Sequence, residues 1–270
     1  MLDRTCFKDL SLSCDSHRRI GFAMNAHAHL FGLGLFPLPD AARLAQLDPG
    51  TARRWSEGYS FTYKGEKRVS HGIMPLALDR VGAHRDLTFA ELLTLRLVKA
   101  FKGAGLGLPT IKRVAERAAA DFGIAMPFVS RRFRTDGRKV FIEIQEETPA
   151  NDAPAIPMRD RKLIEVLSGQ HQFADVVEPS LFANVDWHDG LASRWWPLGR
   201  SCAVNLDPAI LFGAPHVAET RVPTSIIAEA VTAEGGGVEA IRAVAEWHGM
   251  TLDQVRDAIR FETEWLKRVA

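Results

Sequence analysis

The strongest constraint on how this 270-residue chain folds is the signal that ends one short helical segment and starts the next. Small and apolar residues recur at helical spacing over residues 40–45 (Ala41, Ala42, Leu44 and Ala45) and let a second helix approach closely. Asp48 then stands at an N-cap position, with Pro49 in the first helical turn. Two helices joined by so short a turn predict a helix-turn-helix, whose second helix enters the DNA major groove.

The first turns of the second predicted helix hold Thr51, Arg53 and Arg54, which we expect to contact DNA. Trp55 is expected to pack between the helices. At least one of the two arginines is expected to pair with Glu57 or to coat the surface, and Thr51 is open to a phosphate contact or to a capping role.

Aromatic and β-branched residues follow over 59–70 and predict a hairpin that turns at Gly65. A hairpin after a recognition helix is a wing, and Lys64, Lys67 and Arg68 are expected to contact backbone phosphates.

Two further helices are predicted, one opened by the capping box Thr88-Phe-Ala-Glu91 and one opened by Pro109. Together, LPDAARLAQLDPGTARRW, the basic hairpin and LTFAELLTLRLVKAFKGAGLGLPTIKRV resemble a MerR-type winged helix-turn-helix. The resemblance implies DNA binding through the second helix and the wing. The dimerising coiled coil usual in that family is not predicted, because no sustained heptad pattern follows Val114.

The middle of the chain reads as β structure. Asp136-Gly137 predicts a hairpin over 130–144, residues 146–157 read as a linker, and short strands are expected over 163–167, 173–177, 185–187 and 202–206. The segment SRWWPLGR carries adjacent tryptophans, of which one can fill the core while the other stays available. Arg194, Trp196 and Arg200 are candidates for a partner surface, because tryptophan and arginine are favoured anchors of interfaces. That both tryptophans pack internally is an equal alternative.

The C-terminal part is expected to form helices over 226–231 and 238–247 and a last helix opened by the capping box Thr251-Leu-Asp-Gln254, with Leu252, Val255, Ile259 and Leu266 on one face. It resembles the small helix-turn-helix domain of VapB-type antitoxins, through Asp207-Pro208, Phe212-Gly213-Ala-Pro215 and Arg221-Val222-Pro223. Glu219 replaces the family's usual glycine. The resemblance implies a type II antitoxin that blocks a PIN-like ribonuclease toxin and represses its own operon.

Charge favours the N-terminal unit as the one that binds DNA. Residues 1–140 hold 23 Lys and Arg against 13 Asp and Glu, a net +10, whereas residues 141–270 hold 11 against 20, a net −9. The last predicted helix starts with Asp253 and Asp257 beside Arg256, and its carboxylates would repel phosphate.

The predicted fold class is α+β and mainly helical. The expected divisions are a leader (1–32), a MerR-like winged helix-turn-helix (33–125), a β-rich region (126–205) and an antitoxin-type helix-turn-helix domain (206–270). We expect a cytoplasmic homodimer that binds its own operator DNA and a toxin, with no membrane span.

No enzyme, cofactor or metal is expected, because the standard catalytic motifs are missing. Asp186, His188 and Asp189 are the best local acid–base group, and Cys14, His17, His27 and His29 match no standard zinc spacing. The alternatives are a stand-alone MerR-like regulator without a toxin and an interaction scaffold that never binds DNA.

Overall fold

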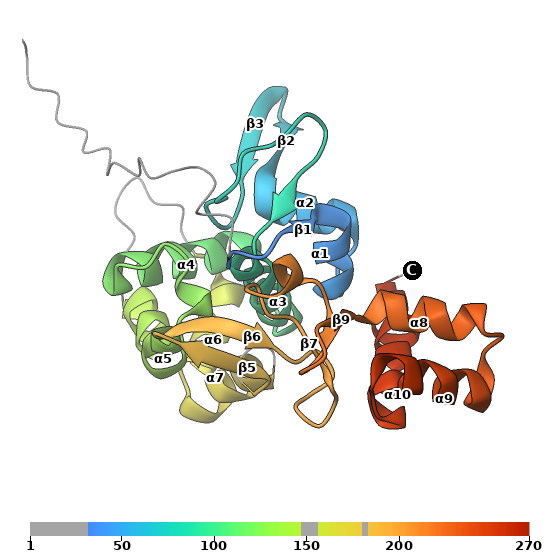
Figure 1. Ribbon diagram of the computed structural model, residues 1–270. Coiled ribbons are helices and arrows are strands. Elements are labelled where there is room, and N and C mark those ends of the chain that lie inside the picture. Colours follow the sequence, from blue (N-terminus) through green and yellow to red (C-terminus); the bar gives the residue numbers. More distant parts are fainter. Residues whose placement is uncertain (1–31, 147–155, 180–182, 270) are drawn as a thin grey trace, which may run out of the picture.

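The computed structural model describes residues 32–146, 156–179 and 183–269. It is mainly helical with small antiparallel sheets, as the predicted α+β class requires. Figure 1 shows a central group of helices, a hairpin that projects from it, and a separate group of helices near the C-terminus. The leader, and with it Cys14, His17, His27 and His29, lies outside the described residues.

The N-terminal unit comprises β1 (Phe36–Pro37), α1 (Leu38–Leu44), α2 (Pro49–Glu57), β2 (Gly58–Tyr63), β3 (Glu66–His71) and β4 (Asp86–Leu87). These are the two helices and the hairpin that the sequence predicts, together with a short strand pair, β1–β4, that the sequence did not predict. Ala41, Ala42 and Ala52 are completely buried, which lets α1 and α2 pack closely. The turn between them uses a left-handed residue, Gln46, whose carbonyl accepts a hydrogen bond of 2.6 Å from Lys99 Nζ.

The β2–β3 hairpin turns at Lys64 and Gly65, both with positive φ, as the sequence predicts. Its base needs glycine at two positions. A Cβ on Gly58 would lie 2.2 Å from the Ser70 carbonyl oxygen, and one on Gly72 would lie 2.0 Å from that of Ser56. Ile73 N donates to Trp55 O at 2.9 Å beside them. The hairpin is therefore fixed directly to the end of α2.

The core is organised around α3 (Phe89–Gly103), with α4 (Leu108–Phe122) beside it. The capping box at Thr88 is confirmed, because Thr88 Oγ1 accepts from Glu91 N at 3.3 Å and Glu91 Oε2 accepts from Thr88 N at 2.7 Å. The larger hydrophobic core runs from Phe36 to Leu206 and includes Phe261.

The strands predicted between residues 130 and 177 are wrong. This part of the chain forms η1 (Pro127–Val129), α5 (Arg131–Glu146), α6 (Met158–Leu167) and α7 (Gln170–Val177). In α5 the buried residues recur at helical spacing (Phe133, Val140, Phe141 and Ile144). Gly137 is not a turn residue, because it lies inside α5 where a Cβ would meet the Phe173 ring at 2.8 Å. Ile164 with Leu167, and Phe173 with Val177, are likewise buried at helical spacing.

In the middle of the chain, strands follow α7. The two-stranded pair β5 (Val185–His188) and β6 (Leu191–Trp195) agrees with the prediction over 185–187. A second sheet joins β7 (Val204–Asn205), β8 (His216–Val217) and β9 (Val222–Pro223), with the turn η3 (Leu211–Gly213) between β7 and β8.

The predicted C-terminal helices are present as α8 (Thr224–Ala233), α9 (Gly237–His248) and α10 (Leu252–Arg260), around a second, smaller core. The chain then continues through η4 (Phe261–Trp265) and η5 (Leu266–Val269). Leu252 and Ile259 pack against the smaller core, but Leu266 packs against the larger one. The expectation that Leu266 shares their face is wrong, because the helix changes its winding at Phe261 and the tail returns to the main core.

The guanidinium of Arg96 lies between two tryptophan rings and so links α3 to β6 and to the C-terminal tail. Arg96 Cζ of α3 lies 4.0 Å from the Trp195 ring centroid and 5.8 Å from that of Trp265. Burial lowers the pKa of Arg96 to about 9, so the side chain is still charged at neutral pH. Trp195 is buried and Trp196 is half-buried, which matches one of the two alternatives that the sequence left open for the adjacent pair.

The base of the hairpin supplies a test of stability. We expect Gly72→Ala to destabilise the protein by about 1–3 kcal/mol, because the new methyl group would overlap backbone at Ser56. Gly103→Ala is the matched control, since a Cβ there meets open space at the end of α3 and is expected to be neutral or stabilising. Thermal unfolding of both variants measures this, and equal changes in Tm would contradict it.

Candidate nucleic-acid interface

The N-terminal turn of α2 is held by its own cap. Asp48 Oδ1 accepts from Thr51 N at 2.8 Å, so Asp48 is the capping residue. Thr51 Oγ1 accepts from Arg54 NH2 at 3.1 Å. Thr51 therefore orients Arg54.

Arg53 and Arg54 both lie exposed on α2. Arg53 Nε is 4.0 Å from Glu57 Oε2, which is the pairing that the sequence suggests for one of the two arginines. The closest partner of Glu57 is Arg85, whose Nε donates at 2.8 Å. Because Arg85 engages that carboxylate, the contact with Arg53 is a loose one, and the Arg53 guanidinium can move toward an anion.

Arg80 also approaches Glu57, at 4.0 Å. Sequence reasoning missed Arg80 and Arg85, because they stand in a segment between β3 and β4 that has no periodic pattern. They add two cations to the end of α2.

The hairpin cations do not share one face. Strand pairing places Arg68 opposite Phe61 and Lys67 opposite Thr62, so Arg68 and Lys67 point to opposite faces. Arg68 Cζ lies 4.9 Å from the Tyr63 ring centroid, and Lys64 Nζ lies 5.5 Å from it. The structure brings Thr51, Arg53 and Arg54 together on one helix and divides Lys64, Lys67 and Arg68 between the two sides of the hairpin.

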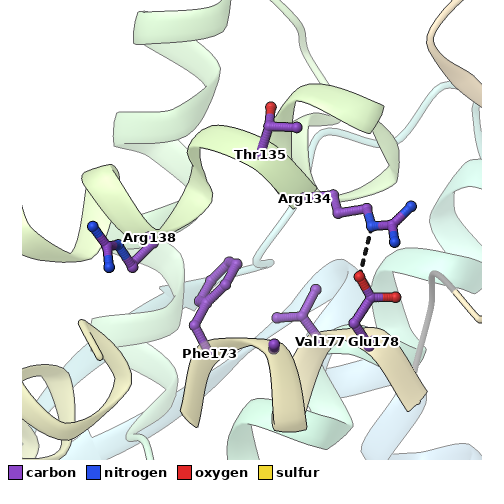
Figure 2. Close-up of a pocket in the computed structure, with 7 residues that line it drawn as sticks. Arg134, Thr135, Arg138, Phe173, Val177 and Glu178 are labelled. Carbon is purple, nitrogen blue, oxygen red and sulfur yellow. Dashed lines mark hydrogen bonds and ion pairs between the residues drawn. The ribbon is translucent and has the colours of Figure 1, made fainter. Parts of the chain in front are cut away.

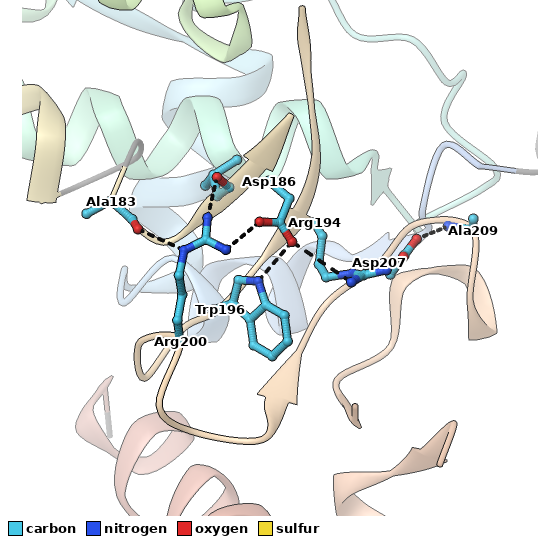
Figure 3. Close-up of polar contacts among 8 residues, drawn as sticks. Ala183, Asp186, Arg194, Trp196, Arg200, Asp207 and Ala209 are labelled. Atoms are coloured by element: carbon cyan, nitrogen blue, oxygen red, sulfur yellow. Dashed lines mark hydrogen bonds and ion pairs between the residues drawn. The ribbon is translucent and has the colours of Figure 1, made fainter. Parts of the chain in front are cut away.

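The three residues singled out for partner binding surround one carboxylate, Asp186 (Figure 3). Arg200 NH1 donates to Asp186 Oδ1 at 2.5 Å, and Trp196 Nε1 donates to Oδ2 at 3.1 Å. Arg194 NH1 lies 3.9 Å from the same Oδ2, while its NH2 donates to Asp207 Oδ2 at 2.9 Å.

Asp186 is therefore the centre of an ion network, a role that the sequence did not reveal. Partial burial alone would raise its pKa, but the hydrogen bonds from Trp196 and Arg200 and the nearby positive charges hold the pKa below its usual value. The sequence grouped Asp186 with His188 and Asp189, but those two side chains are exposed, at the end of β5 and in the turn that follows it.

No catalytic arrangement is evident among the described residues. A groove of about 330 Å³ lies between α5 and α7, and Arg134 Nε donates there to Glu178 Oε1 at 2.6 Å. Figure 2 shows the side chains that line it. Thr135, the one hydroxyl among its described lining residues, donates to the Arg132 carbonyl, and none of the predicted site residues lies there. Within the described ranges, no group of three His, Cys, Asp or Glu could hold a metal ion.

The last helix presents the acidic start that the sequence indicates. Asp253 is exposed and pairs with Arg256 at 2.9 Å. Asp257 has a structural contact, because its Oδ2 accepts from Ala203 N at 2.8 Å beside β7. Over the described residues, no helix combines the length and apolarity that a membrane crossing requires.

Comparisons with known proteins find similarity over most of the chain. A family model described as a protein of unknown function, DUF433, matches residues 204–261. The chain is 26% identical over 231 residues to "Putative antitoxin VapB45" of Mycobacterium tuberculosis (strain ATCC 25618 / H37Rv), which covers 85% of this chain and 94% of the relative. The crystal structure of Rv2018 from Mycobacterium tuberculosis is similar in fold, with 24% identity and a TM-score of 0.63, over 85% of this chain and 99% of that one.

The Asp186 network predicts a pH-dependent stability. Because the folded pKa is lowered, the carboxylate stabilises the fold above its unfolded pKa, and this contribution is lost as the pH falls through the folded value. We expect Asp186→Asn to lower the free energy of unfolding by about 1 kcal/mol at pH 7. As the pH falls below about 4, the free energy of unfolding of this variant should approach that of the parent protein. The matched control is Asp189→Asn, whose side chain is 90% exposed. Urea titrations across pH test this, and a loss that does not vary with pH would contradict it.

Proposed function

We propose that this protein is a DNA-binding antitoxin, which blocks a PIN-like ribonuclease toxin and represses its own operon. The observation that carries the proposal is the match to a relative named as an antitoxin, which extends over 94% of that relative's length. The similarity therefore includes the N-terminal unit as well as the C-terminal helices. We further propose a cytoplasmic homodimer without enzymatic activity of its own.

For operator binding, we propose that α2 enters the major groove. Helix-turn-helix proteins read base edges with the N-terminal residues of the second helix. Arg53 and Arg54 follow the N-terminal turn of this nine-residue helix and are exposed. Among the described residues, the Arg53 side chain has a long ion pair with Glu57 and the Arg54 side chain donates to the Thr51 hydroxyl. An arginine can form two parallel hydrogen bonds to guanine O6 and N7.

The hairpin cations supply phosphate contacts in this proposal. Lys64, Lys67 and Arg68 are all exposed, and Gly58 joins the hairpin to α2 without an intervening loop. A wing fixed in this way can contact backbone phosphate while α2 occupies the groove. The start of α10 is less suited to the task, because the Asp253 carboxylate is 87% exposed and would face phosphate.

For toxin binding, we propose the surface around Arg194, Trp196 and Arg200. The resemblance to VapB-type antitoxins implies a nuclease partner with an acidic metal site, and arginine pairs strongly with carboxylates. The Arg200 side chain is 51% exposed despite its contact with Asp186. Toxin carboxylates would compete with Asp186 for that guanidinium.

Fluorescence anisotropy on the protein's own upstream duplex, over a salt series, tests operator binding. We expect Arg53→Ala/Arg54→Ala to weaken specific binding by at least about tenfold, since one bidentate base contact contributes about 1–3 kcal/mol. Arg256→Ala is the matched control, because Arg256 is similarly exposed at the start of α10. Loss of binding in the control alone would show that α10, and not α2, recognises the DNA. Equal affinity of the parent protein for the upstream duplex and for scrambled DNA would contradict specific operator binding.

Toxin binding is tested separately, by pull-down with the product of the neighbouring gene. We expect Arg194→Glu/Arg200→Glu to abolish capture, and Arg242→Glu, an exposed arginine of α9, to leave it unchanged. Circular dichroism checks that the first variant is folded. Unchanged capture by the folded variant would rule out this surface.

A further inference from the structure

The β2–β3 hairpin carries a row of exposed aromatic rings that the core does not use. Tyr59, Phe61 and Tyr63 are 43%, 40% and 48% exposed. They alternate along β2, so their side chains lie on one face of the hairpin. Hairpins usually bury one face, but every β2 residue after Gly58 is exposed. Figure 1 shows the hairpin projecting away from the helices.

Cations surround these rings. Arg68 and Lys64 both lie over the Tyr63 ring, at 4.9 and 5.5 Å from its centroid. The strands and turn of the hairpin hold three Lys and Arg against one acidic residue, Glu66. The centres of protein–protein interfaces are depleted of charged residues, whereas nucleic acids offer flat base faces together with phosphates. Rings interleaved with cations therefore favour nucleic acid over an apolar protein surface.

The spacing of the rings selects among nucleic acids. Alternate residues on a strand are about 6.6 Å apart, which is roughly twice the 3.4 Å separation of stacked bases in one strand of a duplex. A duplex cannot present successive bases to successive rings, because its bases remain stacked on each other. A single strand can separate its bases and stack each one on an aromatic side chain.

The hairpin is also held in a fixed position. Gly58 and Gly72 allow close backbone approach at its base, and Tyr59 and Phe61 rings contact each other with centroids 5.7 Å apart. A ring that is already ordered loses little entropy when it binds a ligand.

We propose that the aromatic face of the β2–β3 hairpin, formed by Tyr59, Phe61 and Tyr63, binds unpaired bases of single-stranded nucleic acid by stacking. This goes beyond operator recognition, which is assigned to Arg53 and Arg54 on α2. Lys67 points from the opposite face of the hairpin and stays available for duplex phosphate. In that complex, Arg68 and Lys64 would contact the phosphates of the single strand in place of duplex phosphates.

Fluorescence anisotropy of the full chain with a labelled oligothymidylate of about twelve nucleotides tests the proposal. We expect salt-dependent binding that Phe61→Leu/Tyr63→Leu weakens by about tenfold or more, because leucine keeps the apolar surface but removes the ring. Tyr63→Phe alone, with Phe61 unchanged, retains both rings and is expected to bind the oligothymidylate as the parent protein does. Val69→Ala is the control, since Val69 is 60% exposed and points from the other face.

Binding to the upstream duplex, measured in parallel, separates this proposal from operator recognition. Retained duplex binding with lost oligothymidylate binding supports the aromatic face. No oligothymidylate binding by the parent protein, or equal binding by the leucine variant, would overturn the proposal. Loss of toxin capture by the leucine variant, with oligothymidylate binding intact, would overturn it in favour of a protein-docking surface.

Discussion

The contact on which the arrangement of the chain depends is the Arg96 guanidinium between two tryptophan rings. Arg96 belongs to α3, Trp195 to the end of β6 and Trp265 to the tail after α10. Desolvating a charge is costly, but the ring faces carry negative potential and compensate in part. Gln46 Nε2 donates to Trp265 O at 2.6 Å, which brings the turn between α1 and α2 into the same cluster. Three distant segments thus meet at one cation.

This cluster gives the proposed DNA-binding unit a rigid support. Lys99, one turn after Arg96 on α3, holds the α1–α2 turn through the Gln46 carbonyl. Phe261 and Leu266 pack with the larger core, although α8, α9 and α10 have a core of their own. The C-terminal helices are therefore joined to the rest both by the chain before β8 and by the tail. A partner that displaces the tail would disturb the Trp265 contact and the turn before α2 together.

Local signals predicted the ends of the molecule well and its middle poorly. The Asp48 cap, the Gly65 turn and the capping boxes at Thr88 and Thr251 fix their elements through neighbouring atoms, so the sequence reveals them. The hairpin predicted within residues 131–146 was wrong because Asp-Gly is common in turns, whereas here the distant Phe173 ring lies too close to position 137 for a residue with a Cβ. The Asp186 network and the approach of Arg85 to Glu57 join segments by tertiary contacts, which no local pattern encodes. The alternation of aromatic residues along β2 is visible in the sequence, but there it indicates only a hairpin and does not show that the rings form an exposed surface.

We propose that α2 and the β2–β3 hairpin, not α10, recognise DNA. Hydrogen–deuterium exchange of the full chain, with and without its upstream duplex, tests this most directly, because the parent protein is measured without any substitution. We expect slower exchange over residues 49–71 with the upstream duplex and a weaker effect with scrambled DNA. Slower exchange confined to residues 251–260, with 49–71 unchanged, would contradict it.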